Sequence, residues 1–167
     1  MSQDNLSRPS EWSSPQPPAA SQMKPIVILM ADDDHDDCLL AREAFAESHL
    51  INELRFVHDG AELMDYLFQR GEYSAPGAAP RPGMILLDLN MALKDGREAL
   101  RKIKNHPDLK RTPVIILTTS RAEEDIVNSY DLGVNSFIVK PVTFKALVEE
   151  MQALGHYWIE IVELPSN

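Results

Sequence analysis

The chain has 167 residues, of which 44% are apolar and 25% charged, ordinary values for a globular protein of one domain. Sixteen Lys and Arg against 26 Asp and Glu give a formal net charge of -10, which disfavours a nucleic-acid-binding or anionic-membrane surface. The single cysteine, Cys38, excludes an internal disulfide and a cysteine zinc cluster.

Residues 1–23 are rich in Pro and Ser and have no hydrophobic periodicity, which predicts a disordered tail. No apolar core follows a basic start, so a secretory signal is not expected. The longest apolar run, residues 26–31, is far shorter than the roughly 20 residues that span a bilayer. We therefore expect no transmembrane helix and a cytoplasmic location.

From Lys24 onward, short apolar runs rich in β-branched residues alternate with segments of helical periodicity. Strands are predicted at 26–31, 54–58, 84–88, 114–118 and 134–140. Helices are predicted at 36–48, 61–70, 96–105, 122–132 and from 143 to about 158, with a Pro/Gly loop at 71–83. Five such βα units are too few for an eight-stranded barrel and predict an open, doubly wound parallel α/β sheet.

The predicted strands end in side chains that can do chemistry. These are Asp32, Asp33 and Asp34 after the first strand, Asp88 in the third, Thr118 in the fourth and Lys140 in the fifth. The carboxyl ends of parallel strands meet at one edge of the sheet, which is where such folds bind ligands. Carboxylates gathered there repel one another unless a hard divalent cation neutralises them, and Mg²⁺ is the natural occupant.

A carboxylate beside Mg²⁺, with a lysine and a hydroxyl nearby, has what phosphoryl transfer needs: a nucleophile and positive charge on the transferring group. One Asp at a strand end is usually a turn or helix-capping residue. The joint placement of these groups at four strand ends is what indicates a reaction site.

A calcium-binding EF-hand loop is an alternative interpretation of the acidic run, because Asp32, Asp34, Asp36 and Glu43 match its template spacing. Two features argue against it: Asp37 stands where the loop needs glycine, and a strand replaces the preceding helix. Asp36 and Asp37 are better explained by the first turn of a helix, where the helix dipole favours anions.

Two further residue types have an ordinary structural interpretation. The five histidines have no mutual metal-ligand spacing and are predicted to be surface or helix-end residues. Cys38 is predicted to be a small packing residue, since no base is placed beside it.

Several motifs together resemble the receiver domains of two-component response regulators. They are ILMADDDHDD, MILLDLN around Asp88, KDGREAL, VIILTTS around Thr118 and VNSFIVKP with Lys140. The resemblance implies the flavodoxin-like strand order 2-1-3-4-5 and a receiver domain at 24–155, followed by an extension at 156–167. HDGAELMDYLFQRGEY and GHYWIEIVELP are most similar to the stand-alone regulators that partner bacterial phytochrome histidine kinases.

The resemblance also implies roles for the metal and the acceptor. Asp88 would accept a phosphoryl group from a kinase phosphohistidine. Asp33 would bind Mg²⁺ directly and Asp32 through water, with Asp88 and the backbone carbonyl of Asn90 as further ligands.

The remaining roles concern the response to the phosphoryl group. Lys140 would pair with it, Thr118 would hydrogen-bond it, and Phe137 stands at the family's aromatic switch position. Thr119 departs from the small residue that the family usually has there, and its hydroxyl would bear on the rate of dephosphorylation.

Two other functions are weighed against a phosphoacceptor. A haloacid-dehalogenase-type phosphatase needs an acidic residue where this chain has Asn90, and its metal carboxylates follow the nucleophile, whereas Asp32 and Asp33 precede Asp88. A receiver-like scaffold that binds partners without phosphorylation is the second alternative.

The predicted extension at 156–167 has 12 residues, too few for an output domain. The resemblance therefore implies a non-enzymatic regulator that signals by binding protein partners. The apolar ending HYWIEIVELP predicts a homodimer made partly by this segment. The resemblance adds the fourth helix, fifth strand and fifth helix as a second dimer face.

Overall fold

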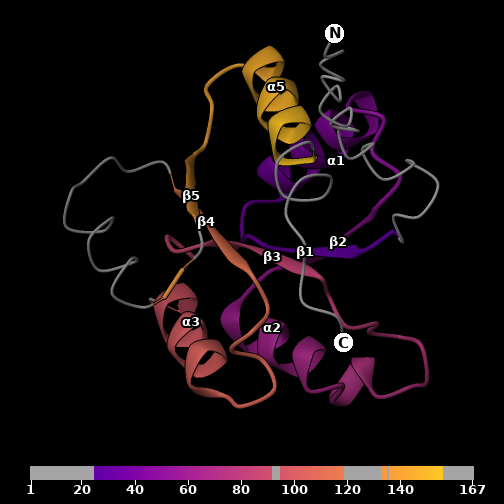
Figure 1. The fold of residues 1–167 in the computed structure, drawn as a ribbon, viewed down its shortest axis with the longest axis vertical. Helices are drawn as coiled ribbons and strands as arrows, with labels where there is room; N and C mark the ends of the chain where they lie inside the picture. The colour runs from indigo at the N-terminus through magenta and orange to yellow at the C-terminus, as the bar shows by residue number, and fades with distance from the viewer. Residues whose placement is uncertain (1–24, 92–94, 119–132, 135, 156–167) are drawn as a thin grey trace, which may run out of the picture.

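The computed structural model describes residues 25–91, 95–118, 133, 134 and 136–155 (Figure 1). The strands are β1 (Val27–Ala31), β2 (Glu53–Val57), β3 (Met84–Asp88), β4 (Val114–Thr118) and β5 (Ser136–Val139). The helices are α1 (His35–Glu47), α2 (Gly60–Leu67), the 3₁₀ helix η2 (Gly71–Tyr73), α3 (Asp95–Asn105) and α5 (Phe144–Leu154). The predicted tail, the helix predicted at 122–132 and the predicted extension lie outside the described residues.

The five strands form one parallel sheet in the order β2-β1-β3-β4-β5, which confirms the predicted fold class and topology. Ala31 is level with Leu87 in the register of β1 and β3, so the residues that follow them, Asp32 and Asp88, emerge side by side. Thr118 is level with Val139, one residue before Lys140. The register therefore brings the predicted reactive residues to one edge.

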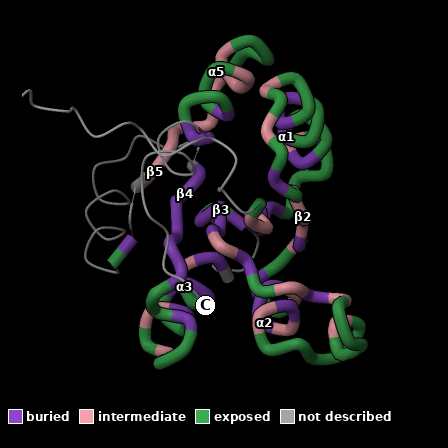
Figure 2. Tube along the Cα trace, turned by 45° about the vertical axis from the view of Figure 1, so that its right-hand side comes forward, coloured by how far each residue is buried: buried purple, intermediate pink, exposed green. Residues whose placement is uncertain are grey.

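Helices cover both faces of this sheet. α1 and α5 lie on one face, and α2 and α3 lie on the other (Figure 1). The central strands are buried between these layers while the outer sides of the helices are exposed (Figure 2). All five residues of β3 are buried, as expected for a parallel strand covered on both faces.

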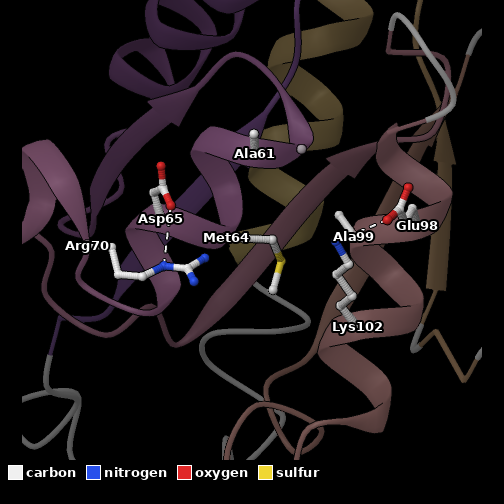
Figure 3. A pocket seen from close by; sticks show the side chains of 8 residues that line it. Ala61, Met64, Asp65, Arg70, Glu98, Ala99 and Lys102 are labelled. Carbon is white, nitrogen blue, oxygen red and sulfur yellow. Dashed lines mark ion pairs between the residues drawn. The ribbon is translucent and has the colours of Figure 1, made fainter.

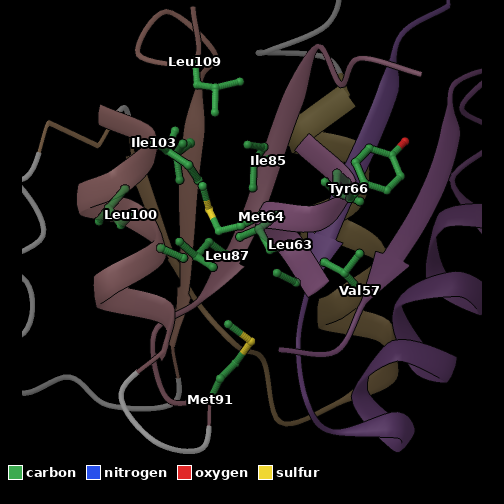
Figure 4. Packing of buried hydrophobic residues seen from close by; sticks show 14 of the residues in the cluster. Val57, Leu63, Met64, Tyr66, Ile85, Leu87, Met91, Leu100, Ile103 and Leu109 are labelled. Carbon is green, nitrogen blue, oxygen red and sulfur yellow. The ribbon is translucent and has the colours of Figure 1, made fainter. Parts of the chain in front are cut away.

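Successive side chains of β3 point to opposite layers, as the pleat of a strand requires. Ile85 and Leu87 pack with Leu63 and Leu100 in the cluster beneath α2 and α3 (Figure 4). Met84 and Leu86 belong to the opposite cluster, which α1 and α5 cover. Asp88 continues the alternation of Met84 and Leu86, which directs it toward the α1 side of the sheet.

Some element boundaries differ from the prediction. The second helix was expected to reach residue 70, but α2 ends at Leu67, and Gln69 adopts a positive φ of 53° that no helix residue has. The fifth strand was expected at 134–140, whereas β5 covers only Ser136–Val139. Among the described residues, none of the helices is both long enough and apolar enough to cross a membrane.

Candidate functional site

Three carboxylates gather at the carboxyl edge of the sheet. Asp32, Asp33 and Asp88 each offer an oxygen, and these oxygens lie within 4.8 Å of one another. Asp32 is completely buried and Asp88 is 4% exposed, whereas Asp33 is exposed. The prediction that these residues meet at one edge is therefore confirmed.

Short hydrogen bonds to the main chain orient the two buried carboxylates. The amide of Asp34 donates to Oδ1 of Asp32 at 2.9 Å, and the amide of Asn90 donates to Oδ1 of Asp88 at 2.8 Å. Each is a local turn in which an Asp accepts from the residue two positions later. In both carboxylates the second oxygen, Oδ2, is left to face the interior of the cluster.

Lys140, directly after β5, fills that interior. Its Nζ donates to Oδ2 of Asp32 at 2.6 Å, of Asp37 at 2.8 Å and of Asp88 at 2.9 Å, which uses all three ammonium donors. Burial alone would lower the pKa of Lys140, but these three hydrogen bonds outweigh it, so its pKa is raised. Lys140 is therefore protonated at neutral pH, and its ammonium group contacts Asp88.

Asp37 is a site residue that the sequence prediction assigned only to the first turn of a helix. It does lie there, because Asp34 caps α1 and accepts from the amides of Asp36 at 2.9 Å and Asp37 at 3.2 Å. Its carboxylate also reaches Lys140, 103 residues away in the chain. The capping role of Asp34 also agrees with the interpretation of the acidic run as a helix start.

Burial dominates the electrostatics of Asp32. The pKa of this carboxyl is raised from 3.8 to about 6: burial is the largest cause, Lys140 and the amide of Asp34 oppose the shift, and the charge of Asp88 adds the smallest contribution to it. Burial also raises the pKa of the neighbouring Cys38 thiol to about 12. Cys38 is 6% exposed, so its predicted role as a packing residue is confirmed.

The remaining predicted residues lie around this cluster. Thr118 is the last residue of β4, and its side chain is outside the described part of the structure, as is Thr119. Phe137 is half-buried in β5 and packs against the apolar cluster under α2 and α3. Asn90 is exposed and is tied to Asp88 through its amide.

Two features of the site were missed at the level of the sequence. A Cβ on Gly96 would lie 2.5 Å from the carbonyl oxygen of Asp88 and 2.9 Å from Cα of Leu89, so the start of α3 can approach the acceptor strand only with glycine there. The ring of His58 lies 3.2 Å from the carbonyl oxygen of Asp32, a contact that the prediction of surface or helix-end histidines did not include.

A separate groove lies between α2 and α3 (Figure 3). It has a volume of about 260 Å³ over Met64 and Ala99. One ion pair flanks it on α3, and another joins Asp65 of α2 to Arg70, which follows that helix. None of the three clustered carboxylates lines this groove. The cluster of carboxylates and this groove are therefore at different places on the molecule.

The acidic cluster suits a hard divalent cation. Its donors are carboxylate oxygens, two of them from buried residues, and oxygen is the ligand that Mg²⁺ and Mn²⁺ prefer. Within the described residues, no other group of three or more His, Cys, Asp or Glu side chains is placed to hold a metal ion. Cation binding would also relieve the repulsion between these carboxylates.

Comparison with known proteins identifies the family. Residues 28–152 match the response regulator receiver domain. The chain belongs to the response regulator receiver family. It is 44% identical over 142 residues to the response regulator Rcp1 of Synechocystis sp., covering 85% of this chain and 95% of that relative.

Two solved structures are similar to this response regulator. The Mn²⁺-bound form of Rcp1 has a TM-score of 0.76 and 44% identity, covering 85% of this chain and all of that one. The phosphorylated cyanobacterial phytochrome response regulator RcpA has a TM-score of 0.78 and 43% identity, with 86% and 100% coverage. The family resemblance predicted from the sequence is confirmed, and these findings do not favour a phosphatase or an unphosphorylated scaffold.

Proposed function

We propose that this response regulator accepts a phosphoryl group from the phosphohistidine of a sensor kinase on Asp88. The observation that supports this most directly is the nearly buried Asp88 carboxylate, which shares a cluster with two other carboxylates and receives a hydrogen bond from Lys140. A carboxylate oxygen of Asp88 would form the new bond to phosphorus as the bond from phosphorus to the histidine nitrogen breaks. The product is an aspartyl phosphate and a free histidine.

Mg²⁺ is the proposed cofactor, held directly by Asp33, Asp88 and the backbone carbonyl of Asn90, and by Asp32 through water. When bound, it supplies positive charge to the oxygens of the transferring group. The oxygen-only donor set supports this assignment, as does the Mn²⁺ bound to the relative Rcp1.

Lys140, Thr118 and Phe137 are proposed to respond to the phosphoryl group. The Nζ of Lys140 is within 2.9 Å of the acceptor carboxylate, so it can exchange that contact for a charge-assisted bond to a phosphoryl oxygen. Thr118 ends β4 at the same edge and would donate its hydroxyl only after phosphorylation. Phe137 would then repack and carry the change to a partner surface.

Incubation with acetyl phosphate and Mg²⁺ tests this function. We expect one phosphoryl group per chain, labile to acid and base, detected by intact mass. Asp88→Asn, which is isosteric but cannot form an acyl phosphate, is expected to abolish the label. Labelling of Asp88→Asn at the rate of the wild-type protein would refute the assignment.

The kinase is proposed to be a phytochrome-type histidine kinase, and a cytoplasmic location is proposed with it. RcpA is a phytochrome response regulator, and its similarity over 86% of this chain supports the same class of partner here. Phosphoryl transfer from a purified phytochrome kinase is expected to be faster than from an unrelated histidine kinase under equal conditions. Equal rates would remove the argument for a phytochrome pathway.

We also propose a homodimer formed by segment 156–167 and by the face made from the helix predicted at 122–132, β5 and α5. The apolar residues of the segment support this, since a monomer with five helices has no evident place for them. Sedimentation of the full chain and of a chain ending at Gly155 tests the segment. A dimer is expected only, or more tightly, with the full chain; equal behaviour would exclude a role for the segment.

A further inference from the structure

The turn between β2 and α2 holds the main chain of Asp32 on both sides. The amide of Asp32 donates to the carbonyl of Val57 at 3.0 Å, and the Nδ1 atom of His58 lies 3.2 Å from the carbonyl oxygen of Asp32. A carbonyl oxygen can only accept, so Nδ1 of His58 must carry the proton in this contact. The main-chain amide and the main-chain carbonyl of Asp32 are therefore each held by one of two consecutive residues, Val57 and His58, at the end of β2.

The imidazole is the stronger of two donors to that carbonyl. The other is the Sγ atom of Cys38, at 3.5 Å, and a thiol is a weak donor. The ring of His35, at the start of α1, packs against the His58 ring with centroids 4.6 Å apart. The ring of His58 is thus confined between α1 and the peptide that it contacts.

Glu62 fixes the backbone of His58. The amide of His58 donates to Oε2 of Glu62 at 2.6 Å, while the amide of Glu62 donates to Oδ1 of Asp59 at 2.7 Å. This is a reciprocal helix-capping arrangement in which Asp59 is the N-cap of α2, except that the glutamate reaches one residue further back than in the usual capping box.

The second oxygen of Glu62 is held by the segment between α2 and β3. The hydroxyl of Tyr73 donates to Oε1 of Glu62 at 2.6 Å, and the Tyr73 ring lies edge-on to Tyr66 at 5.1 Å between centroids. Burial, and then the hydrogen bond to Glu62, raise the pKa of Tyr73, so its hydroxyl stays a donor at neutral pH. Both oxygens of the glutamate are therefore occupied, which restrains it further.

We propose that His58 is a positioning residue for the acidic site: its imidazole fixes the peptide of Asp32, and Glu62 with Tyr73 fixes His58. Asp32 is fully buried and holds Lys140 at 2.6 Å, so a shift of its peptide moves a carboxylate that faces both the metal position and the lysine. This role rests on the proposed function, because it assumes that the acidic cluster binds the cation used in phosphoryl transfer.

A pair of variants of equal size tests the hydrogen bond itself. His58→Asn keeps an N–H donor near the position of Nδ1, and His58→Leu has nearly the same shape without a donor. We expect His58→Leu to bind Mn²⁺ about tenfold more weakly than the wild-type protein, in the range of outer contacts to metal ligands. His58→Asn is expected to stay within about twofold, since the donor survives.

Mn²⁺ binding is measured on the full chain from the electron paramagnetic resonance signal of the free ion, which does not depend on phosphorylation. Phosphoryl incorporation from acetyl phosphate is then measured at low and at saturating Mg²⁺. His58→Leu is expected to be slow at low Mg²⁺ and to recover as Mg²⁺ saturates. Equal Mn²⁺ affinity of the two variants, whether both normal or both weak, would overturn the positioning role.

Glu62→Met provides the second variant, which keeps the inference testable if His58→Leu does not fold. Methionine is similar in length to glutamate but offers only a weak thioether acceptor, so it cannot replace the hydrogen bonds from the His58 amide and the Tyr73 hydroxyl. Weaker Mn²⁺ binding in Glu62→Met supports the relay, and wild-type affinity overturns it. If the wild-type protein takes no phosphoryl group, the proposed function fails; if it does and these variants bind Mn²⁺ normally, only the role of His58 fails.

Discussion

The acidic edge of the sheet, where Asp32, Asp33 and Asp88 meet Lys140, and the groove between α2 and α3 both combine carboxylates with cationic side chains. The two regions differ in how exposed these side chains are and in how their charges balance. In the groove, Arg70 pairs with Asp65 at 3.3 Å and Lys102 pairs with Glu98 at 3.0 Å (Figure 3). All four of these side chains are about half exposed, between 48% and 62%. At the acidic edge, the side chain of Lys140 is only 14% exposed.

The balance of charge differs as well. Each cation of the groove has one carboxylate, whereas Lys140 is shared by Asp32, Asp37 and Asp88. Exposed pairs contribute about 0–1 kcal/mol to stability, because solvent screens them. A buried charge that opposite charge does not fully neutralise destabilises the fold, and such charges are found mainly at functional sites. The functional region is therefore distinguished by the burial of its charged side chains and by the excess of carboxylates over cations, and not by the presence of a groove.

The largest effect is expected from removing the cation of the acidic edge. Lys140→Met leaves the buried carboxylates of Asp32 and Asp88 uncompensated, and we expect a loss of about 3–5 kcal/mol in the free energy of unfolding. Urea unfolding at pH 8 in the absence of Mg²⁺ measures it. Lys145→Met, on the exposed side of α5, is the control and should cost little.

This loss should depend on pH with a definite sign. The pKa of Asp32 is about 6 in the fold against 3.8 ordinarily, so the stability from its neutral form is complete below 3.8 and disappears as the pH rises through about 6. Lys140 lowers that pKa, and its removal raises it further. Lys140→Met should therefore be less destabilising at pH 5 than at pH 8; equal losses at both values would contradict this account of the charge.

A smaller effect is expected from filling the space at Gly96. Gly96→Ala places a Cβ 2.5 Å from the carbonyl oxygen of Asp88, and backbone atoms cannot yield as a flexible side chain can. We expect a loss of about 2 kcal/mol and slower phosphorylation, since the acceptor strand must shift. Arg101→Ala, on the exposed face of α3, is the matched control. Normal phosphorylation of Gly96→Ala would show that the close approach does not position Asp88.

The smallest effect is expected in the groove. Lys102→Met removes the charge of an exposed pair but keeps most of the side chain, and we expect a change below about 0.5 kcal/mol with no change in phosphorylation. Urea unfolding and the acetyl phosphate assay measure both. A loss above about 1 kcal/mol, or altered labelling, would mean that the two regions are coupled.

The site residues that could be predicted from the sequence are those fixed by strand order. Because parallel strands end at a common edge, the positions of Asp32, Asp88 and Lys140 in their strands were enough to predict that they meet. The end of α2 could not be predicted, because neither glycine nor proline marks Gln69, where the backbone leaves the helix.

The contacts of Asp37 and His58 depend on packing between elements. Asp37 reaches Lys140 only because α1 begins beside the end of β5, and His58 reaches Asp32 only because the ends of β1 and β2 are level, with Ala31 opposite Val57. Neither residue has a local pattern that differs from a helix start or an exposed turn. Such roles follow from the three-dimensional register and not from composition or spacing.

The central claim is that Asp88 carries the phosphoryl group, and chemical mapping of the modified residue tests it most directly. Borohydride reduces an acyl phosphate to the alcohol, so an aspartyl phosphate becomes homoserine at its own position. After reaction with acetyl phosphate and Mg²⁺, peptide mass spectrometry is expected to find homoserine at position 88 and at none of the other acidic residues. Homoserine at position 32, 33 or 37, with position 88 unchanged, would contradict the account.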